Sequence, residues 1–144
     1  MSLSLVLRFV HILAALTWIG GMLFIALVLV PVTRRFEPAL RTRLVHETGV
    51  RFRAVGWIAI AVLVTSGMLN LWLRPELLSA PRFYWKVSIV VAALALSAVH
   101  DFVLGPRAGR PGADPGLRVR ASWIARFNVV LVLVVVALGV ALRG

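Results

Sequence analysis

Four long apolar runs constrain this chain more than any other feature of its sequence. A helix needs about 20 mostly apolar residues to cross a bilayer, and each run is long enough. Of the 144 residues, 61% are hydrophobic, so little of the chain is left for anything else. The sequence therefore predicts an all-α integral membrane protein, a four-helix bundle that forms one domain over residues 1–144 in the lipid bilayer. The predicted spans are residues 5–32, 55–73, 84–104 and 123–142.

The segments between the runs indicate how the spans are joined. The first run is too long for a signal peptide and leads straight to a second span, so we expect it to be retained. Residues 37–53 are too polar to span. Pro38 suits a first helical turn, and Leu40, Leu44 and Val45 share a face, which predicts a short cytoplasmic amphipathic helix before span two. Residues 105–116, rich in glycine and proline, are expected to form a connector.

Charge predicts the orientation. The net charge is +11, and most of the arginines lie in short loops beside apolar runs, which favours membrane topology over nucleic-acid binding. Arginines are densest in residues 33–53 and 105–120, so these connections should be cytoplasmic. We therefore expect a multi-pass protein of the cell (inner) membrane with both termini exterior. The absence of cysteine excludes disulfides, thiolate zinc sites and iron–sulfur clusters.

The chain has one lysine, and one of its three histidines lies well inside an apolar run. His11 should point into the bundle because a ring facing lipid would leave its nitrogens unsatisfied. At about 100° per residue, Trp18 and Met22 follow His11 along one stripe. Lys86 and Asn70 belong to the outer halves of spans three and two, so the topology predicts that they share a membrane layer with His11.

Each of these residues also has a simpler structural interpretation. Lys86 can extend its ammonium to the interface, and His11 can make an interhelical hydrogen bond. Met22 and Met68 suit packing, since methionine fills irregular gaps, and Asn70 suits helix association.

A second polar layer is expected at the cytoplasmic side. Two histidines and two carboxylates could bind a metal, but nearby arginines compete for the carboxylates, which favours a network of ion pairs. The sequence contains no hydrolase triad, phosphate-binding glycine loop or HExxH motif. The function class that these absences leave open is binding of a metal or a flat cofactor within the helical bundle. The layer comprises His46, Glu47, His100, Asp101 and Arg126.

The sequence resembles two related groups of small membrane proteins. The motif WIGG in span one and LVTSGMLNL in span two are similar to the copper-resistance D (CopD) domain family. The chain length, the lysine-to-histidine spacing in span three and the RFN opening of span four resemble the HemJ family of protoporphyrinogen oxidases. The HemJ resemblance implies that His11 is a heme b ligand and that Lys86 belongs to the functional set.

Two departures from the HemJ pattern bear on activity. HemJ-like proteins have an arginine late in span one and an acidic residue after the span-four asparagine, where this chain has Leu27 or Leu29 and Val129. Protoporphyrinogen oxidation is therefore not expected, and the sequence leaves open whether the protein is an oxidoreductase. A bound heme that serves electron transfer or sensing remains compatible with the sequence.

The leading hypothesis is a heme b protein with His11 as axial ligand and with Lys86, Trp18 and Asn70 beside the cofactor. The first alternative is a copper-handling protein of the CopD type that uses His11 with Met22 or Met68. The second is a cofactor-free assembly subunit. A homo-oligomer and a membrane redox partner are compatible with each. Small residues should let the helices approach closely, namely Gly20, Gly21, Gly56 and Gly67.

Overall fold

The computed structural model describes residues 3–110 and 112–141, and these residues are almost entirely helical with no strand among them. Four helical stretches in this part of the chain are long and apolar enough to cross a membrane, as the sequence predicts. The chain divides into two compact units, Met1–Ser79 and Ala80–Gly144. Each unit is built around a helical hairpin.

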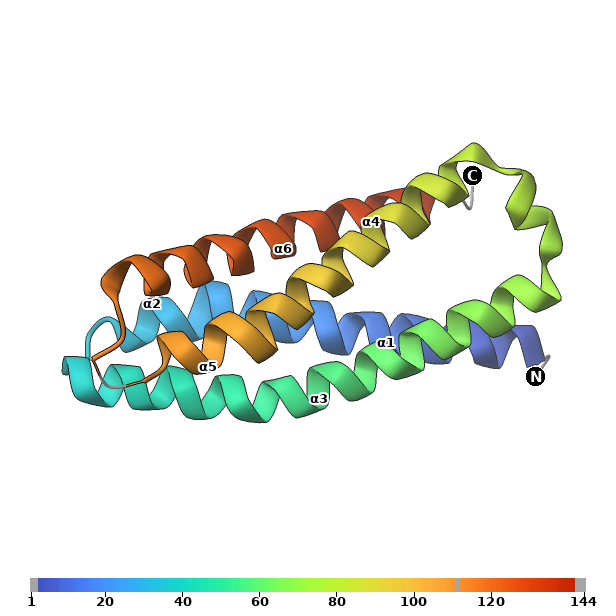
Figure 1. The fold of residues 1–144 in the computed structure, drawn as a ribbon. Coiled ribbons are helices and arrows are strands. Elements are labelled where there is room, and N and C mark those ends of the chain that lie inside the picture. The colour runs from blue at the N-terminus through green and yellow to red at the C-terminus, as the bar shows by residue number, and fades with distance from the viewer. Residues whose placement is uncertain (1–2, 111, 142–144) are drawn as a thin grey trace. The chain divides into compact units, whose positions relative to one another are not determined.

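The first hairpin pairs the first two spans. Helix α1 (Leu3–Phe24) continues through a π-helical segment η1 (Ile25–Leu29) into the short helix α2 (Val30–Thr33). After a tight connection, α3 (Pro38–Leu73) returns and packs along α1, as Figure 1 shows in blue and green. A short 3-10 helix, η2 (Pro75–Ser79), follows it.

The second hairpin repeats this order of elements. Helix α4 (Pro81–Ala98) runs through a π-helical segment η3 (Val99–Leu104) into the short helix α5 (Gly105–Ala108). Helix α6 (Pro115–Ala141) then packs against α4 (Figure 1). Ala93 of α4 and Val132 of α6 are each only 1% exposed, so the centre of this hairpin is closely packed.

Prolines account for the two π-helical segments. Pro31 follows η1 and Pro106 follows η3, and a proline offers no N–H and collides with the carbonyl four residues earlier. A wider π turn before the proline relieves that collision while the helix continues. His11 precedes Pro31 by twenty residues and Lys86 precedes Pro106 by the same number, so the two residues occupy equivalent places in the two hairpins.

The helices extend further than the hydropathy pattern predicts. Residues 38–53 are helical, as expected, but they continue into span two without a break and form no separate short helix. An Arg43–Glu47 pair at 2.8 Å, one turn apart, supports this polar stretch. Helix α6 begins at Pro115, eight residues before the predicted span, because Asp114 accepts hydrogen bonds from the first free amides of the helix. The predicted end of span four at residue 142 lies outside the described residues.

The connector between the third and fourth spans is shorter than the predicted residues 105–116. Residues 105–108 stay helical, because the wide π turn of η3 accommodates Pro106 and the helix continues into α5. The chain turns at residues 109–110 and 112–114, where Gly112 has φ +76°, a conformation that favours glycine.

Two aromatic residues interlock the helices of the first hairpin. Phe52 of α3 lies against Gly21 of α1, so close that a Cβ on Gly21 would stand 2.6 Å from the ring Cζ. Trp18 of α1, which is 5% exposed, lies against Gly56 of α3. The prediction that glycines allow close approach is supported here. Gly20 differs, since a Cβ there would meet nothing within 4 Å.

Candidate functional site

His11 lies in the first hairpin, where it faces α3. Its Nδ1 is 3.0 Å from the hydroxyl oxygen of Ser66, and both residues lie inside the apolar parts of their helices. Ser66 is 3% exposed and His11 is half-buried. The predicted inward direction of His11 is therefore consistent with the contact, and the interhelical hydrogen bond that we considered as its simpler interpretation is present.

The direction of this hydrogen bond follows from the other bonds of Ser66. Its hydroxyl donates to the Val62 carbonyl at 2.6 Å, with a longer contact of 3.2 Å to the Leu63 carbonyl. Since the single hydroxyl hydrogen is used there, the oxygen accepts from His11, whose Nδ1 carries the proton. The other ring nitrogen of a neutral imidazole, Nε2, then carries the lone pair. A neutral histidine that binds a metal does so through the nitrogen that carries this lone pair.

Gly67 and Asn70 complete the α3 side of this site. A Cβ on Gly67 would lie 3.3 Å from Cε1 of His11, so the glycine lets the ring approach the α3 backbone. The amide nitrogen of Asn70 donates to the Ser66 carbonyl at 2.9 Å. Asn70 therefore makes a bond within its own helix and supports the segment that holds Ser66.

The other residues predicted near His11 are placed differently. Trp18 is buried, as the predicted stripe requires, but its known contact is with Gly56. Met22 lies eleven residues beyond His11 in the continuous helix α1, a separation of about 16 Å at 1.5 Å per residue. His11 and Met22 are therefore too far apart to hold one ion together. Met68 is 67% exposed.

Lys86 lies in the second hairpin, where it packs against α6. Its Nζ would be 3.7 Å from a Cβ on Gly139, so the ammonium lies against the α6 backbone near the end of that helix. Lys86 is half-buried. Its expected pairing with His11 joins the two units and stays a prediction.

A buried polar pair lies deeper in the second hairpin. The amide nitrogen of Asn128 donates to the hydroxyl of Ser97 at 2.7 Å, and the two residues are 4% and 5% exposed. Within the described residues, the amide oxygen of Asn128 has no hydrogen-bond partner. The pair joins α4 to α6 in an apolar interior, where such bonds favour helix association.

The residues of the predicted second polar layer make local contacts within each hairpin, and the layer as a whole stays a prediction. In the first hairpin, His46 is exposed and Glu47 is bonded to Arg43. In the second, Nδ1 of His100 lies 3.0 Å from the carboxylate of Asp101. No group of three or more histidine, aspartate or glutamate side chains suited to a metal occurs within the part of the chain that the structure describes.

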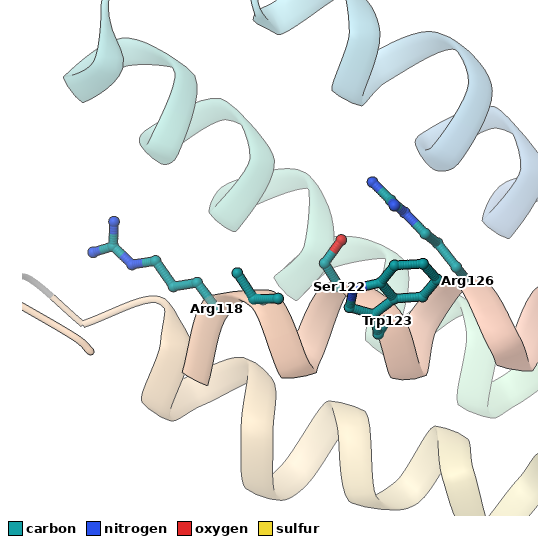
Figure 2. A pocket seen from close by; sticks show the side chains of 5 residues that line it. Arg118, Ser122, Trp123 and Arg126 are labelled. Atoms are coloured by element: carbon teal, nitrogen blue, oxygen red, sulfur yellow. The ribbon is translucent and has the colours of Figure 1, made fainter. Parts of the chain in front are cut away.

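Arg126, the last member of that layer, is stacked on an aromatic ring. Its guanidinium carbon is 5.4 Å from the centre of the Trp123 ring, a cation–π distance. Both residues line a shallow hollow on α6, which Figure 2 shows. Arg126 therefore belongs to a surface feature of α6, and it takes part in none of the ion pairs formed by the described residues.

Sequence reasoning missed the two serines that contact the predicted residues. Ser66 stands directly before Gly67 and one turn before Asn70, and Ser97 stands in an alanine-rich stretch. The place of Ser66 beside Gly67 in span two made it one candidate partner for His11, but the sequence does not give the register of α1 against α3. Ser97 had no comparable signal, because no polar residue near it in the sequence indicates a partner on span four.

Comparison with known proteins gives two matches. The model of a family described as copper resistance protein D matches residues 46–142. A protein of Aquifex aeolicus (strain VF5), described only as an uncharacterized protein, is 31% identical over 136 residues, which cover 94% of this chain and 92% of that protein. No solved structure matches the chain. The family match includes Ser66, Gly67 and Lys86, and it begins after His11.

Proposed function

This chain belongs to the copper resistance protein D family, and from that membership we propose that it is a membrane protein that handles copper, with His11 as a ligand. The observation that carries the proposal is the hydrogen bond between Nδ1 of His11 and Ser66. It fixes the tautomer in which Nε2 carries the lone pair, and metal-binding histidines commonly use one nitrogen for the metal and the other for such a bond.

The available donors favour Cu(I) as the cargo. The chain offers histidine and methionine side chains but no cysteine, and imidazole and thioether groups suit copper. Met68 follows Gly67, the residue against His11, and is the methionine in the same stretch of α3. A transient site with few ligands fits a protein that passes an ion on better than one that stores it.

Copper binding can be measured on purified protein by competition with a chromophoric Cu(I) chelator. We expect wild-type protein to retain copper and His11→Ala to lose it. His46→Ala is the matched control, because it removes an exposed histidine from the same hairpin. Equal copper retention by wild type and His11→Ala would refute the role of His11. Met68→Leu should weaken binding more than Met22→Leu if Met68 assists.

Heme b with His11 as axial ligand is the second candidate, and the same tautomer favours it. An axial histidine also binds through one nitrogen while the other donates a hydrogen bond. Protein purified from heme-replete cells should then show a Soret band that His11→Ala abolishes. A colourless protein that binds copper would favour the first candidate, and one that binds neither would favour an assembly subunit.

We also propose that the two arginine-rich connections face the cytoplasm and that both termini are exterior. The arginines of residues 33–53 and 105–120 support this orientation through the positive-inside rule. Because the chain has no cysteine, single-cysteine variants are directly usable. A membrane-impermeant thiol reagent should label Ser79→Cys in intact cells after outer-membrane permeabilisation and leave Arg110→Cys unlabelled.

A further inference from the structure

A shallow hollow on the polar end of α6 has features that the proposed copper function does not use. Its volume is about 330 Å³, and it is formed by side chains of one helix face. Figure 2 shows Arg118 and Arg126 on either side of Ser122 and Trp123, with the Arg118 side chain extending away from them and the Arg126 side chain leaning over them. The lining residues are Arg118, Val119, Ser122, Trp123 and Arg126.

Two arginine side chains give this hollow its positive charge. Among the described residues, neither Arg118 nor Arg126 takes part in an ion pair within 4 Å. The nearest acid in sequence, Asp114, accepts hydrogen bonds from the backbone amides of Gly116 and Leu117. Arg118 donates one bond, of 3.4 Å, to the Arg110 carbonyl, which leaves its charge unbalanced.

The position of the hollow along α6 is that of a membrane interface. After Arg126, no charged residue occurs before the described end of the helix at Ala141. Trp123 is 63% exposed, and tryptophan is enriched where lipid headgroups meet the hydrocarbon. Arg126 stacks on this ring and lies at the edge of the apolar stretch. An anion that reaches this position from the membrane is a headgroup.

We propose that the hollow binds the phosphate of an anionic phospholipid headgroup. Arg118 and Arg126 lie two turns apart on one face, so their guanidinium groups can approach a phosphate from both sides. Ser122 lies between them with a hydroxyl that can donate to a phosphate oxygen. Trp123 holds Arg126 at headgroup level. This site shares no residue with the proposed copper site, since every lining residue belongs to α6.

The test compares lipids on the purified full-length protein. Native mass spectrometry in an equal mixture of phosphatidylglycerol and phosphatidylcholine should show preferential retention of phosphatidylglycerol. Arg118→Gln and Arg126→Gln should each lower that preference about fivefold, the effect of one arginine at a membrane surface. Arg120→Gln is the matched control, because it removes the same charge from an exposed position of α6 outside the hollow.

Several results would overturn the proposal. The wild type could show no preference between the two lipids, or Arg120→Gln could lower it as much as Arg118→Gln, which would indicate unspecific charge attraction. Displacement of the lipid by inorganic phosphate alone would identify a free anion as the ligand. Should Arg126→Gln fail to fold by circular dichroism, Arg126→Lys is measured in its place, since it keeps the charge and loses the two-pronged guanidinium contact. A lowered preference for phosphatidylglycerol in Arg126→Lys would support the hollow as the site, and an unchanged preference would indicate charge attraction alone.

Discussion

His11 donates a hydrogen bond to Ser66, whose hydroxyl in turn donates to the Val62 carbonyl one helical turn earlier. This short relay ties the orientation and tautomer of a membrane-embedded imidazole to the backbone of α3. The histidine is therefore held by its neighbours before any ligand arrives, which is the condition for a precise ligand position.

Removing the hydroxyl of Ser66 should weaken copper binding while leaving His11 in place. Ser66→Ala takes away the acceptor that fixes the tautomer, and loss of such a partner costs about 10- to 100-fold in metal affinity. Thr65→Ala is the control, since Thr65 is exposed on the same helix. The Cu(I) competition assay measures the effect. A Ser66→Ala protein that binds copper as tightly as Thr65→Ala would contradict the relay.

Adding a side chain at Gly21 should destabilise the protein, whereas adding one at Gly20 should not. A Cβ at Gly21 would collide with the Phe52 ring, so Gly21→Ala should cost about 1–3 kcal/mol of stability through overpacking. Gly20→Ala adds the same methyl group where nothing lies within 4 Å. Thermal unfolding in detergent should show a lowered Tm for Gly21→Ala alone. Equal shifts for both variants would mean that the ring moves aside without cost.

The buried contact between Ser97 and Asn128 should stabilise the second hairpin. A double-mutant cycle with Ser97→Ala and Asn128→Ala isolates the contact, and we expect a coupling energy of about 0.6 kcal/mol, the average for such bonds in membranes. Steric trapping or denaturant unfolding in detergent micelles supplies the four stabilities. Strict additivity of the two substitutions would show that the 2.7 Å bond contributes nothing.

Glu76 in η2, outside the spans, should make stability depend on pH. A hydrogen bond from its own backbone amide, and then the bond and charge of Arg74 at 3.1 Å, hold its pKa below the usual range. The stabilisation is thus present above the unfolded pKa of about 4.3 and is lost as pH falls through the lowered folded pKa. The Tm difference between wild type and Glu76→Gln should vanish in acid. A difference that is constant with pH would contradict this.

The spans were predictable because hydrocarbon selects for apolar length, and that selection is visible in composition alone. The helical extensions were not, because Asp114 and the Arg43–Glu47 pair stabilise polar helix through single contacts that leave no hydropathy pattern. The π-helical segments were also missed. They follow from Pro31 and Pro106, yet a proline near a span end predicts a helix stop as readily as a wide turn.

The site was predictable in part. The inward direction of His11 was predicted because its ring nitrogens would be unsatisfied in lipid, and its contact with Ser66 of α3 is consistent with that direction. The identity of its partner was not predictable, because choosing Ser66 from α3 requires the register of α1 against α3, which the glycine and aromatic contacts determine. The sequence likewise predicted the membrane layer of Lys86 but not its contact with Gly139, because that contact depends on the register of α4 against α6.

The interlock of Phe52 with Gly21 bears on how the WIGG motif transfers between proteins. Trp18 and Gly21 of that motif pack α1 against α3. Their presence in another chain therefore indicates the same helix packing and does not indicate the same bound ion or cofactor. Relatives that keep the joint but lack a histidine equivalent to His11 should fold alike and bind something else. The residues that determine what each relative binds should then be sought one and two helical turns before the WIGG motif, where His11 lies in this chain.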